Sequence, residues 1–463
     1  MPKNVEMPEI TREGGCSSSI GKGKIASPGG ASAESVYLLC SYQIRCLMIA
    51  GGSLIPTCFY TSLRVTTIKD LSCKALRAGH TEGVILFDYL KKYPPGGLVE
   101  PVPRGYHVLM RVQSDLTKNR RRNRTALILL TLAVIVLAFV CLFVGSSHMT
   151  VAECFAALAK KGSAAQVRII WNIRIPRVLA AIIAGAGLSI SGLIMQTDLN
   201  NPMASPSTLG VSNAAVFGAN LSIIAFAGGF LDTGNHLSSY TVGANPYATS
   251  LMAFLFSTAS ILLILGLCRL RAFQPGVVVL AGIAIGSVWT AATTILQFYA
   301  TDVGLSAAVI WTFGDLGRAT YHTDCIMAVV VLAGLLFFTL MSWQFNALLS
   351  GDAAAKSMGV AVDRLRFVSM LLASVITAVC VSFLGIIGFV GIICPHVTKR
   401  LLGQDHRVSV PASALSGSVL LLLADTLSRS MGNGSALPVG AITSLLGAPF
   451  FLAIIFTRKG EHD

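Results

Sequence analysis

From Thr125 onward the chain contains long stretches without any Asp, Glu, Lys or Arg, and these stretches decide what it can fold into. They cover residues 125–152, 178–197, 199–231, 233–268, 272–301, 325–351, 367–398, 408–424 and 430–457. A helix needs about 20 mostly apolar residues to cross the hydrocarbon core of a bilayer. The pattern therefore predicts an all-α protein that crosses a membrane several times.

The composition excludes two other classes of chain. Only 12% of the 463 residues are charged, 54% are hydrophobic, and the mean hydropathy is +0.71. A soluble domain carries about 25% charged residues, and a disordered chain needs low hydrophobicity. The net charge of +14 raises nucleic-acid binding as an alternative. The densest basic cluster, Lys118 to Arg124, directly precedes the first apolar stretch, where an orientation signal belongs, so no nucleic-acid partner is expected.

The longest charge-free stretches predict the number of helices. Residues 367–398 are too many for one span, and Gly385, Gly388 and Gly391 interrupt them, so we divide this stretch in two. Lys and Arg are more frequent in the connections that lie on the same side of the membrane as the N-terminus, which predicts cytoplasmic N- and C-termini. Ten transmembrane helices are expected, near 125–146, 176–197, 209–229, 247–268, 275–298, 323–343, 365–384, 387–402, 409–429 and 438–457.

The first quarter of the chain has a different character. We expect residues 1–110 to be a disordered extension. The moderately apolar run 36–63 contains Arg45 and Pro56, and a further span there is the alternative. A start at Met110 is a second alternative, which leaves 1–110 outside the working protein. The expected organisation is the extension 1–110, a basic cytoplasmic juxtamembrane segment 111–124 and a ten-helix membrane domain 125–459.

A pair of arginines marks the outer start of the second helix. Arg174 and Arg177 flank Pro176, which suits the first turn of a helix because it has no N–H to lose. Two guanidinium groups at an outer helix end predict a docking site for acidic side chains of an external partner. Anchoring among lipid headgroups is the alternative.

A short helix is expected on the inner side, between the sixth and seventh spans. Asp352 can cap it, Lys356 lies within it, and Gly359 can end it. Such a helix is a natural contact for a soluble subunit, and a helix that simply lies at the membrane interface is the alternative.

Three other segments combine turn signals with isolated polar residues. The inner loop that contains Asn201-Pro202 is either functional or a plain tight connection. His396 follows Pro395 at the inner end of a short span, and a structural hydrogen bond is the alternative to a ligand or proton relay. Asp425 is an acid in an apolar context, which points to function, although a pair with Arg429 on the same helix face is the simpler account.

The amino-acid sequence contains none of several common catalytic motifs. It contains no phosphate-binding loop with Gly-Lys-Ser/Thr, no His-Glu-x-x-His, no Gly-x-Ser-x-Gly and no Cys-x-x-Cys. We therefore expect no catalytic residue, no metal site and no cofactor. Two alternative functions are a transporter driven by an ion gradient, with Asp198, Asp315 and Asp425 as candidate acids, and an intramembrane enzyme.

Seven segments, taken in order, resemble the FecCD family, the permease subunits of ABC importers for iron siderophores and cobalamin. They are RIPRVLAAIIAGAGLSISGLIMQ, NNPMASPSTLGVSNAAVFGA, VVLAGIAIGS, SGDAAAKSMGV, GIIGFVGIICPHVTKRLLGQDHR, LLLADTLSR and LPVGAITSLLGAPFFL. The resemblance covers about residues 125–459, nearly the whole apolar part.

The resemblance implies a type II importer permease in a bacterial cytoplasmic (inner) membrane, without enzymatic activity of its own. Its implied partners are a second permease subunit (identical or related), two cytoplasmic ATPase subunits and an extracytoplasmic substrate-binding protein. The implied cargo is a ferric siderophore, with cobalamin or haem as the alternative.

The resemblance also assigns roles to residues. The implied docking residues are Arg174, Arg177 and Arg429; the ATPase-coupling residues are Gly351, Asp352, Lys356 and Gly359; the path and gate residues are Pro275, Gly276, Gly282 and Gly286; the structural motif residues are Asn201, Pro202, Gly388, Gly391, Pro395, His396, Pro438 and Gly440.

Overall fold

The computed structural model describes residues 45–50, 53–58, 104–145, 149–226, 245–269, 275–431 and 437–457. The chain divides into two units, Met1–Gln113 and Ser114–Asp463. In the first unit, β1 (Arg45–Ala50) and β2 (Ser53–Cys58) pair as an antiparallel hairpin. The described part of the run 36–63 is therefore strand. Most of residues 1–103 lies outside the described residues, so the disorder expected there stays a prediction.

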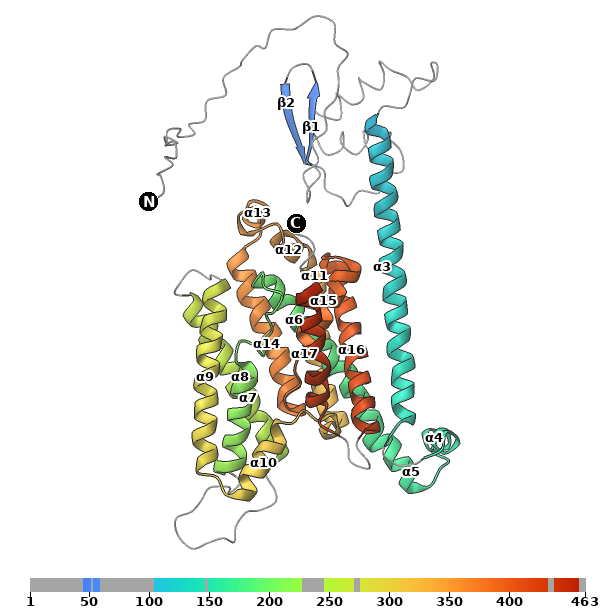
Figure 1. Cartoon of the computed structure of the whole chain (residues 1–463), viewed down its shortest axis with the longest axis vertical. Coiled ribbons are helices and arrows are strands. Elements are labelled where there is room, and N and C mark those ends of the chain that lie inside the picture. The colour runs from blue at the N-terminus through green and yellow to red at the C-terminus, as the bar shows by residue number, and fades with distance from the viewer. Residues whose placement is uncertain are drawn as a thin grey trace, which may run out of the picture. The chain divides into compact units, whose positions relative to one another are not determined.

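The second unit is a bundle of helices (Figure 1). Its helices are α3 (Arg104–Phe143, which begins in the first unit), α4 (Val151–Leu158), α5 (Ala164–Arg168), α6 (Ile175–Asp198), α7 (Val211–Asn220), α8 (Pro246–Arg269), α9 (Pro275–Phe298), α10 (Asp302–Thr312), α11 (Tyr321–Leu340), α12 (Ser342–Leu348), α13 (Asp352–Ser357), α14 (Val362–Leu384), α15 (Val390–Leu402), α16 (His406–Ser430) and α17 (Val439–Thr457), with the π turns η1 (Ile169–Arg174) and η2 (Leu221–Phe226) and the 3₁₀ turn η3 (Leu316–Arg318).

The polytopic helical architecture is confirmed. Among the described residues, seven helices are long and apolar enough to cross a membrane, and each of the ten predicted ranges contains a helix. The helices in the ranges 209–229, 387–402 and 438–457 are not among those seven, so a count of ten spans stays a prediction. In Figure 1, α12 and α13 lie at one end of the bundle and α4, α5 and α10 at the other; we call these the α13 end and the α4 end.

Two local features differ from the predictions. The second span begins at Ala164 rather than at Pro176, because the helix continues through η1. There the Ile175 N–H donates to the Ile170 carbonyl, five residues back, and this π turn lets the helix tolerate a proline in its interior. The second difference is α10, an apolar helix that lies between the fifth and sixth predicted spans and that the charge pattern did not predict.

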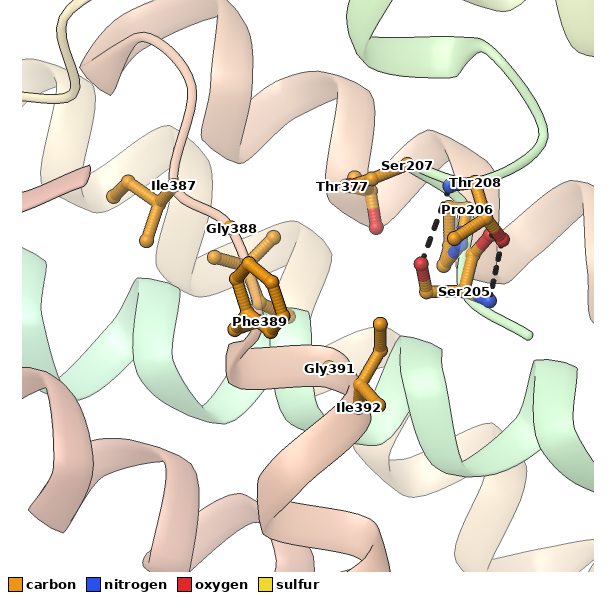
Figure 2. Close-up of a pocket in the computed structure, with 11 residues that line it drawn as sticks. Ser205, Pro206, Ser207, Thr208, Thr377, Ile387, Gly388, Phe389, Gly391 and Ile392 are labelled. Atoms are coloured by element: carbon orange, nitrogen blue, oxygen red, sulfur yellow. Dashed lines mark hydrogen bonds between the residues drawn. The ribbon is translucent and has the colours of Figure 1, made fainter. Parts of the chain in front are cut away.

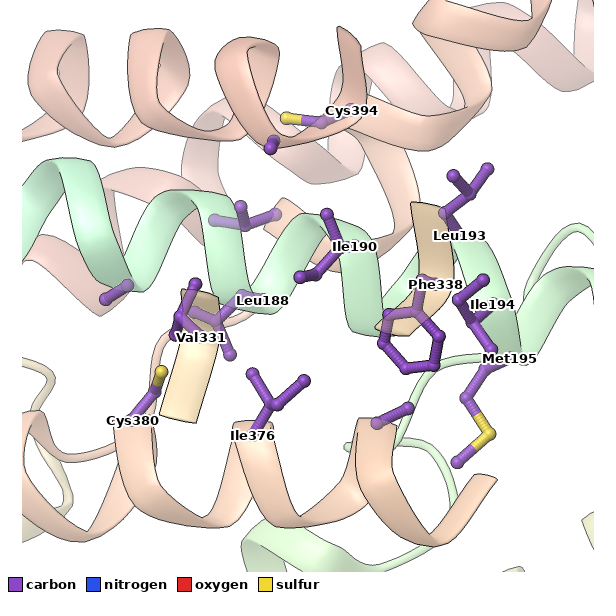
Figure 3. Close-up of a cluster of buried hydrophobic side chains, with 14 of the residues drawn as sticks. Leu188, Ile190, Leu193, Ile194, Met195, Val331, Phe338, Ile376, Cys380 and Cys394 are labelled. Atoms are coloured by element: carbon purple, nitrogen blue, oxygen red, sulfur yellow. The ribbon is translucent and has the colours of Figure 1, made fainter. Parts of the chain in front are cut away.

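Helix α6 is the axis of the bundle. It packs against α11, α14, α15 and α16. In the span Ala164–Asp198, which contains α6, 78% of the most apolar 18-residue stretch is buried inside the protein. Figure 3 shows Leu188 and Ile194 of α6 on the side that faces Val331 and Phe338 of α11 and Ile376 of α14. Contact with α15 and α16 is closer still, because glycines face glycines there: Gly192 meets Gly391, and Gly185 meets Gly417.

A methyl group at Gly192 is therefore expected to destabilise the protein. The Cβ of Gly192→Ala would overlap the backbone carbonyl of Gly391, which cannot rotate away as a side chain can. We expect a loss of about 1–3 kcal/mol, the usual effect of overpacking, seen as a lower unfolding midpoint in detergent. Gly266→Ala, with nothing within 4 Å of the new Cβ, is the matched control and should show no loss. Equal midpoints for the two variants would contradict the close helix contact.

Candidate functional site

A hollow of about 480 Å³ lies between the start of α7 and the face of α9. Its polar lining is uncharged, and no Asp, Glu, Lys or Arg contributes to it. Such a wall can hydrogen-bond a polar solute as it passes without holding it through a full charge. The hydroxyl and amide groups belong to Ser207, Thr208, Asn213, Ser287, Thr290 and Thr294.

Two predicted path residues build this hollow. Gly282 and Gly286 line it, and both are buried against the Leu209–Gly210 backbone, so their small size brings α7 and α9 together. Asn213 fixes the contact by donating to the Gly286 carbonyl and to the Thr290 hydroxyl, both at 3.2 Å. The other two predicted residues, Pro275 and Gly276, begin α9 and do not line the hollow.

Sequence analysis missed the polar face of α9. Ser287, Thr290 and Thr294 are all exposed, and their spacing of three and four residues places them on one face of the helix. That spacing was the available signal. It was hidden because each hydroxyl also donates to a carbonyl four residues back, as Thr294 does to Thr290, which is what an ordinary helix threonine does in an apolar span.

The loop after α6 separates this hollow from a second one of about 240 Å³. Ser207 and Thr208 line both. Ser205 and Thr208 stiffen the loop, since each backbone N–H donates to the other's hydroxyl, at 3.0 and 3.2 Å. The predicted motif residue Asn201 accepts the Met203 N–H at 2.9 Å and so forms the turn around Pro202.

The second hollow gathers other predicted motif residues. Figure 2 shows Gly388, Phe389 and Gly391 across from the 205–208 segment. Phe389 has a φ of 65°, uncommon for an aromatic residue, at the start of α15. Of the remaining motif residues, Pro395 and His396 lie inside α15, Pro438 directly precedes α17, and Gly440 packs against the Ile386 carbonyl.

The predicted coupling residues come together on α13. Gly351 (φ 95°) precedes the helix, and Gly359 (φ 85°) ends it in a Schellman motif, with the Val360 N–H donating to the Ala355 carbonyl at 3.0 Å. Asp352, expected to cap the helix, does not do so. Both of its oxygens instead accept hydrogen bonds from Arg366 of α14 at 2.7 Å, because a guanidinium fork matches a carboxylate better than one backbone N–H does.

At the α4 end, the three predicted docking arginines are buried. Arg174, Arg177 and Arg429 are 4%, 8% and 8% exposed. Asp425 bridges two of them, at 2.6 Å to Arg177 and 2.8 Å to Arg429, so the expected Asp425–Arg429 pair is confirmed. These three guanidinium groups were expected to be accessible on the outer rim, but the structure buries them among their neighbours. Their docking role stays a prediction.

Arg174 and Arg429 also cap the end of α3. Between them they donate to the four backbone carbonyls of residues 141–144, at distances from 2.6 to 3.2 Å. The last carbonyls of a helix have no partner within it, so this capping stabilises α3 against the bundle. A Cβ at Gly145 would lie 2.7 Å from a terminal nitrogen of Arg174, so a larger residue there would have to displace that side chain.

The exposed cations at this end lie on the neighbouring α4–α5 segment instead. Lys160, Lys161 and Arg168 are exposed, and Lys160 lies 5.0 Å from the ring centre of Trp171. The acid of the segment, Glu153, accepts the Thr150 N–H at 2.7 Å, and this hydrogen bond lowers the pKa of Glu153.

Removing the shared carboxylate is expected to destabilise the α4 end. Asp425→Asn leaves the buried Arg429 without its negative partner and Arg177 with only the more distant, partly exposed Asp315 at 3.6 Å, which should cost about 3–5 kcal/mol of unfolding free energy. The unfolding midpoint in detergent measures this. Asp302→Asn, at an exposed position in the first turn of α10, is the control and should change the midpoint little. A normal midpoint for Asp425→Asn would show that the cluster does not hold the fold.

These features define a class of protein, a multi-pass helical membrane protein with an uncharged polar hollow between two of its helices and a short surface helix at one end. Comparison with known sequences gives the family. The sequence model of the FecCD transport family matches residues 132–457, and the chain belongs to that family. It is therefore an ABC transporter permease, a class of subunit that is not itself an enzyme.

Individual relatives agree with this assignment. A Methanocaldococcus jannaschii protein named as an ABC transporter permease is 45% identical over 329 residues, 71% of this chain and 93% of the relative. The hemin transport system permease of Yersinia pestis is 34% identical, over 72% of this chain and 97% of its own. A solved inward-facing structure, described as a metal-chelate type ABC transporter, has a TM-score of 0.61 and 27% identity, and covers 72% of this chain and 99% of that one.

Proposed function

We propose that this chain is the permease of an ATP-driven importer that carries a ferric siderophore across the bacterial cytoplasmic membrane. The observation that carries the proposal is the hollow between α7 and α9, large enough for part of a chelate and lined by neutral hydrogen-bonding groups. The relatives named for hemin and for metal chelates support cargo of this kind. Haem and cobalamin are the alternative cargoes.

Ion-gradient coupling is the less favoured mechanism. It needs an acid that a passing ion can reach, and no Asp or Glu lines either hollow. Asp198 accepts a hydrogen bond from Ser369, and Asp425 is bound to two arginines. Asp315 is paired with Arg177 at 3.6 Å near the α4 end. The work of transport is then supplied by separate ATPase subunits, which we propose bind the α13 end.

The proposed partners are matched to exposed surfaces of the bundle. Only 22% of the most apolar 18-residue stretch of α9 is buried, so most of this helix is open to a neighbour. A second permease subunit is proposed to pack along it and complete the passage. A substrate-binding protein is proposed to dock at the α4 end. The exposed Lys160, Lys161 and Arg168 fit acidic side chains there, with the buried arginines holding the surface in place.

Uptake into liposomes tests the driving force and the cargo. Permease reconstituted with its ATPase and binding protein should take up radioactive iron on a siderophore only when ATP is present inside. Permease alone with an ion gradient should take up none. Gradient-driven uptake by the isolated chain would overturn the proposal. Uptake of hemin or cobalamin, but not of the siderophore, would correct the cargo and leave the mechanism intact.

The polar face of α9 gives a sharper test. Thr294→Leu should lower siderophore uptake several-fold, because it replaces a hydroxyl in the wall of the hollow with a bulky apolar group. Thr339→Leu is the matched control. Thr339 is also exposed and also donates to the carbonyl four residues back, but it lies on α11 away from both hollows. Equal uptake by the two variants, at equal protein level, would remove α9 from the path.

A further inference from the structure

Three consecutive residues at the C-terminal end of α6 each form hydrogen bonds with a different helix. Gln196, Thr197 and Asp198 are 3%, 5% and 0% exposed. Polar side chains buried in this way destabilise a protein unless they are hydrogen-bonded, so their partners matter. Their partners belong to α15, α16 and α14, respectively.

The Asp198 arm leads to α13. Ser369 of α14 donates to Asp198 at 2.5 Å, and Arg366, one turn earlier on α14, lies within electrostatic range of the same carboxylate. Arg366 is buried, with a side chain 5% exposed, yet it donates both ends of its fork to Asp352, whose side chain is 47% exposed. Helix α14 thus holds the surface helix α13 through Arg366 and the axis α6 through Ser369, three residues further along.

The Thr197 arm leads to α12, the helix directly before α13. The Thr197 hydroxyl lies 2.9 Å from Nε2 of His406 on α16. The Asn346 side-chain carbonyl on α12 accepts the His406 backbone N–H at 2.8 Å and lies 2.9 Å from its Nδ1. The segment α12–α13 is therefore tied to α6 at two points, one on each helix.

The Gln196 arm leads to the wall of the second hollow. Its amide nitrogen donates to the carbonyls of Gly391 and Ile392 at 3.4 and 3.3 Å, and both of these residues line that hollow. Lys399, further along α15, donates to the amide oxygen at 3.3 Å.

We propose that Gln196, Thr197 and Asp198 form a relay that passes a displacement of α12–α13 to the wall of the hollow on α15, with Ser369, Arg366 and His406 as its positioning residues. This inference rests on the proposed function, since it needs an ATPase that moves α13. Rigid hydrogen-bonded arms fit the role because packed helices shift between discrete arrangements and do not deform continuously. The exposed Lys356–Asp363 pair at 3.8 Å, by contrast, touches neither arm.

Two buried substitutions test the relay without touching any surface that an ATPase can reach. Ser369→Ala and Thr197→Val each remove one hydroxyl and one arm while keeping the size of the side chain. The readout is siderophore uptake per ATP hydrolysed, in liposomes that contain the permease with its ATPase and binding protein. We expect the double variant to keep its ATPase partner and to lose about fivefold or more in this ratio, the scale of coupling between sites. Its unfolding midpoint should fall, because the buried Asp198 and His406 side chains each lose a hydrogen bond, but the protein should still assemble with its partners.

Ser374→Ala is the matched control on the same helix. Its hydroxyl is fully buried and has no hydrogen-bond partner among the described residues, so its removal should leave the ratio unchanged. A normal ratio in the double variant would overturn the relay while leaving the proposed function standing. Loss of assembly together with uptake would assign the arms a purely structural role and overturn it equally. If the unchanged protein shows no ATP-dependent uptake, it is the proposed function that fails.

Discussion

Backbone-to-backbone contact between α6 and its neighbours is the constraint on which the rest of the bundle depends. Within lipid, apolar side chains gain little by leaving one apolar surface for another, so helices associate through close packing. Here glycines make that packing available at two levels of α6, toward α16 at Gly185 and toward α15 at Gly192. The interface tolerates no added atom at these positions, which makes α6 a rigid axis with little freedom to slide.

The polar residues at the two ends of this rigid axis make different kinds of contact. At the α4 end, Arg177 shares Asp425 with Arg429, which in turn caps α3. This fixes three helices to one another with buried charges, an arrangement that is costly to break because each charge would lose its partner in a dry environment. At the α13 end, the same work is done by side-chain hydrogen bonds and by two ion pairs whose carboxylates are solvent-exposed, Arg366–Asp352 and Lys356–Asp363. Such contacts rearrange at lower cost, so the α13 end is the one suited to movement.

Much of the architecture was visible in the sequence because lipid imposes a one-dimensional rule. Charge-free stretches located a helix in each of the ten ranges, and the i,i+4 spacing of Asp425 and Arg429 predicted their pair. What sequence could not supply was long-range contact. Arg177 lies 248 residues from Asp425 in the chain, so the burial of this arginine follows only from the packing of α6 on α16. Asp352 and Arg366 lie only 14 residues apart, but they belong to different helices, so their pair also depends on how α13 packs against α14.

The uncharged lining of the hollow and the different contacts at the two ends have a common physical explanation under the proposed function. A path that bound its cargo through buried charges would pay a large desolvation penalty in the apo state and would hold the cargo tightly once it arrived. Hydroxyl and amide groups such as those of Asn213 and Thr290 cost less to leave empty, because each already has a partner within the protein. A wall of that kind has weak preferences in either direction. Under the proposed function, direction and selectivity then come from outside the hollow, through the partner proteins that we propose at the two ends of the bundle.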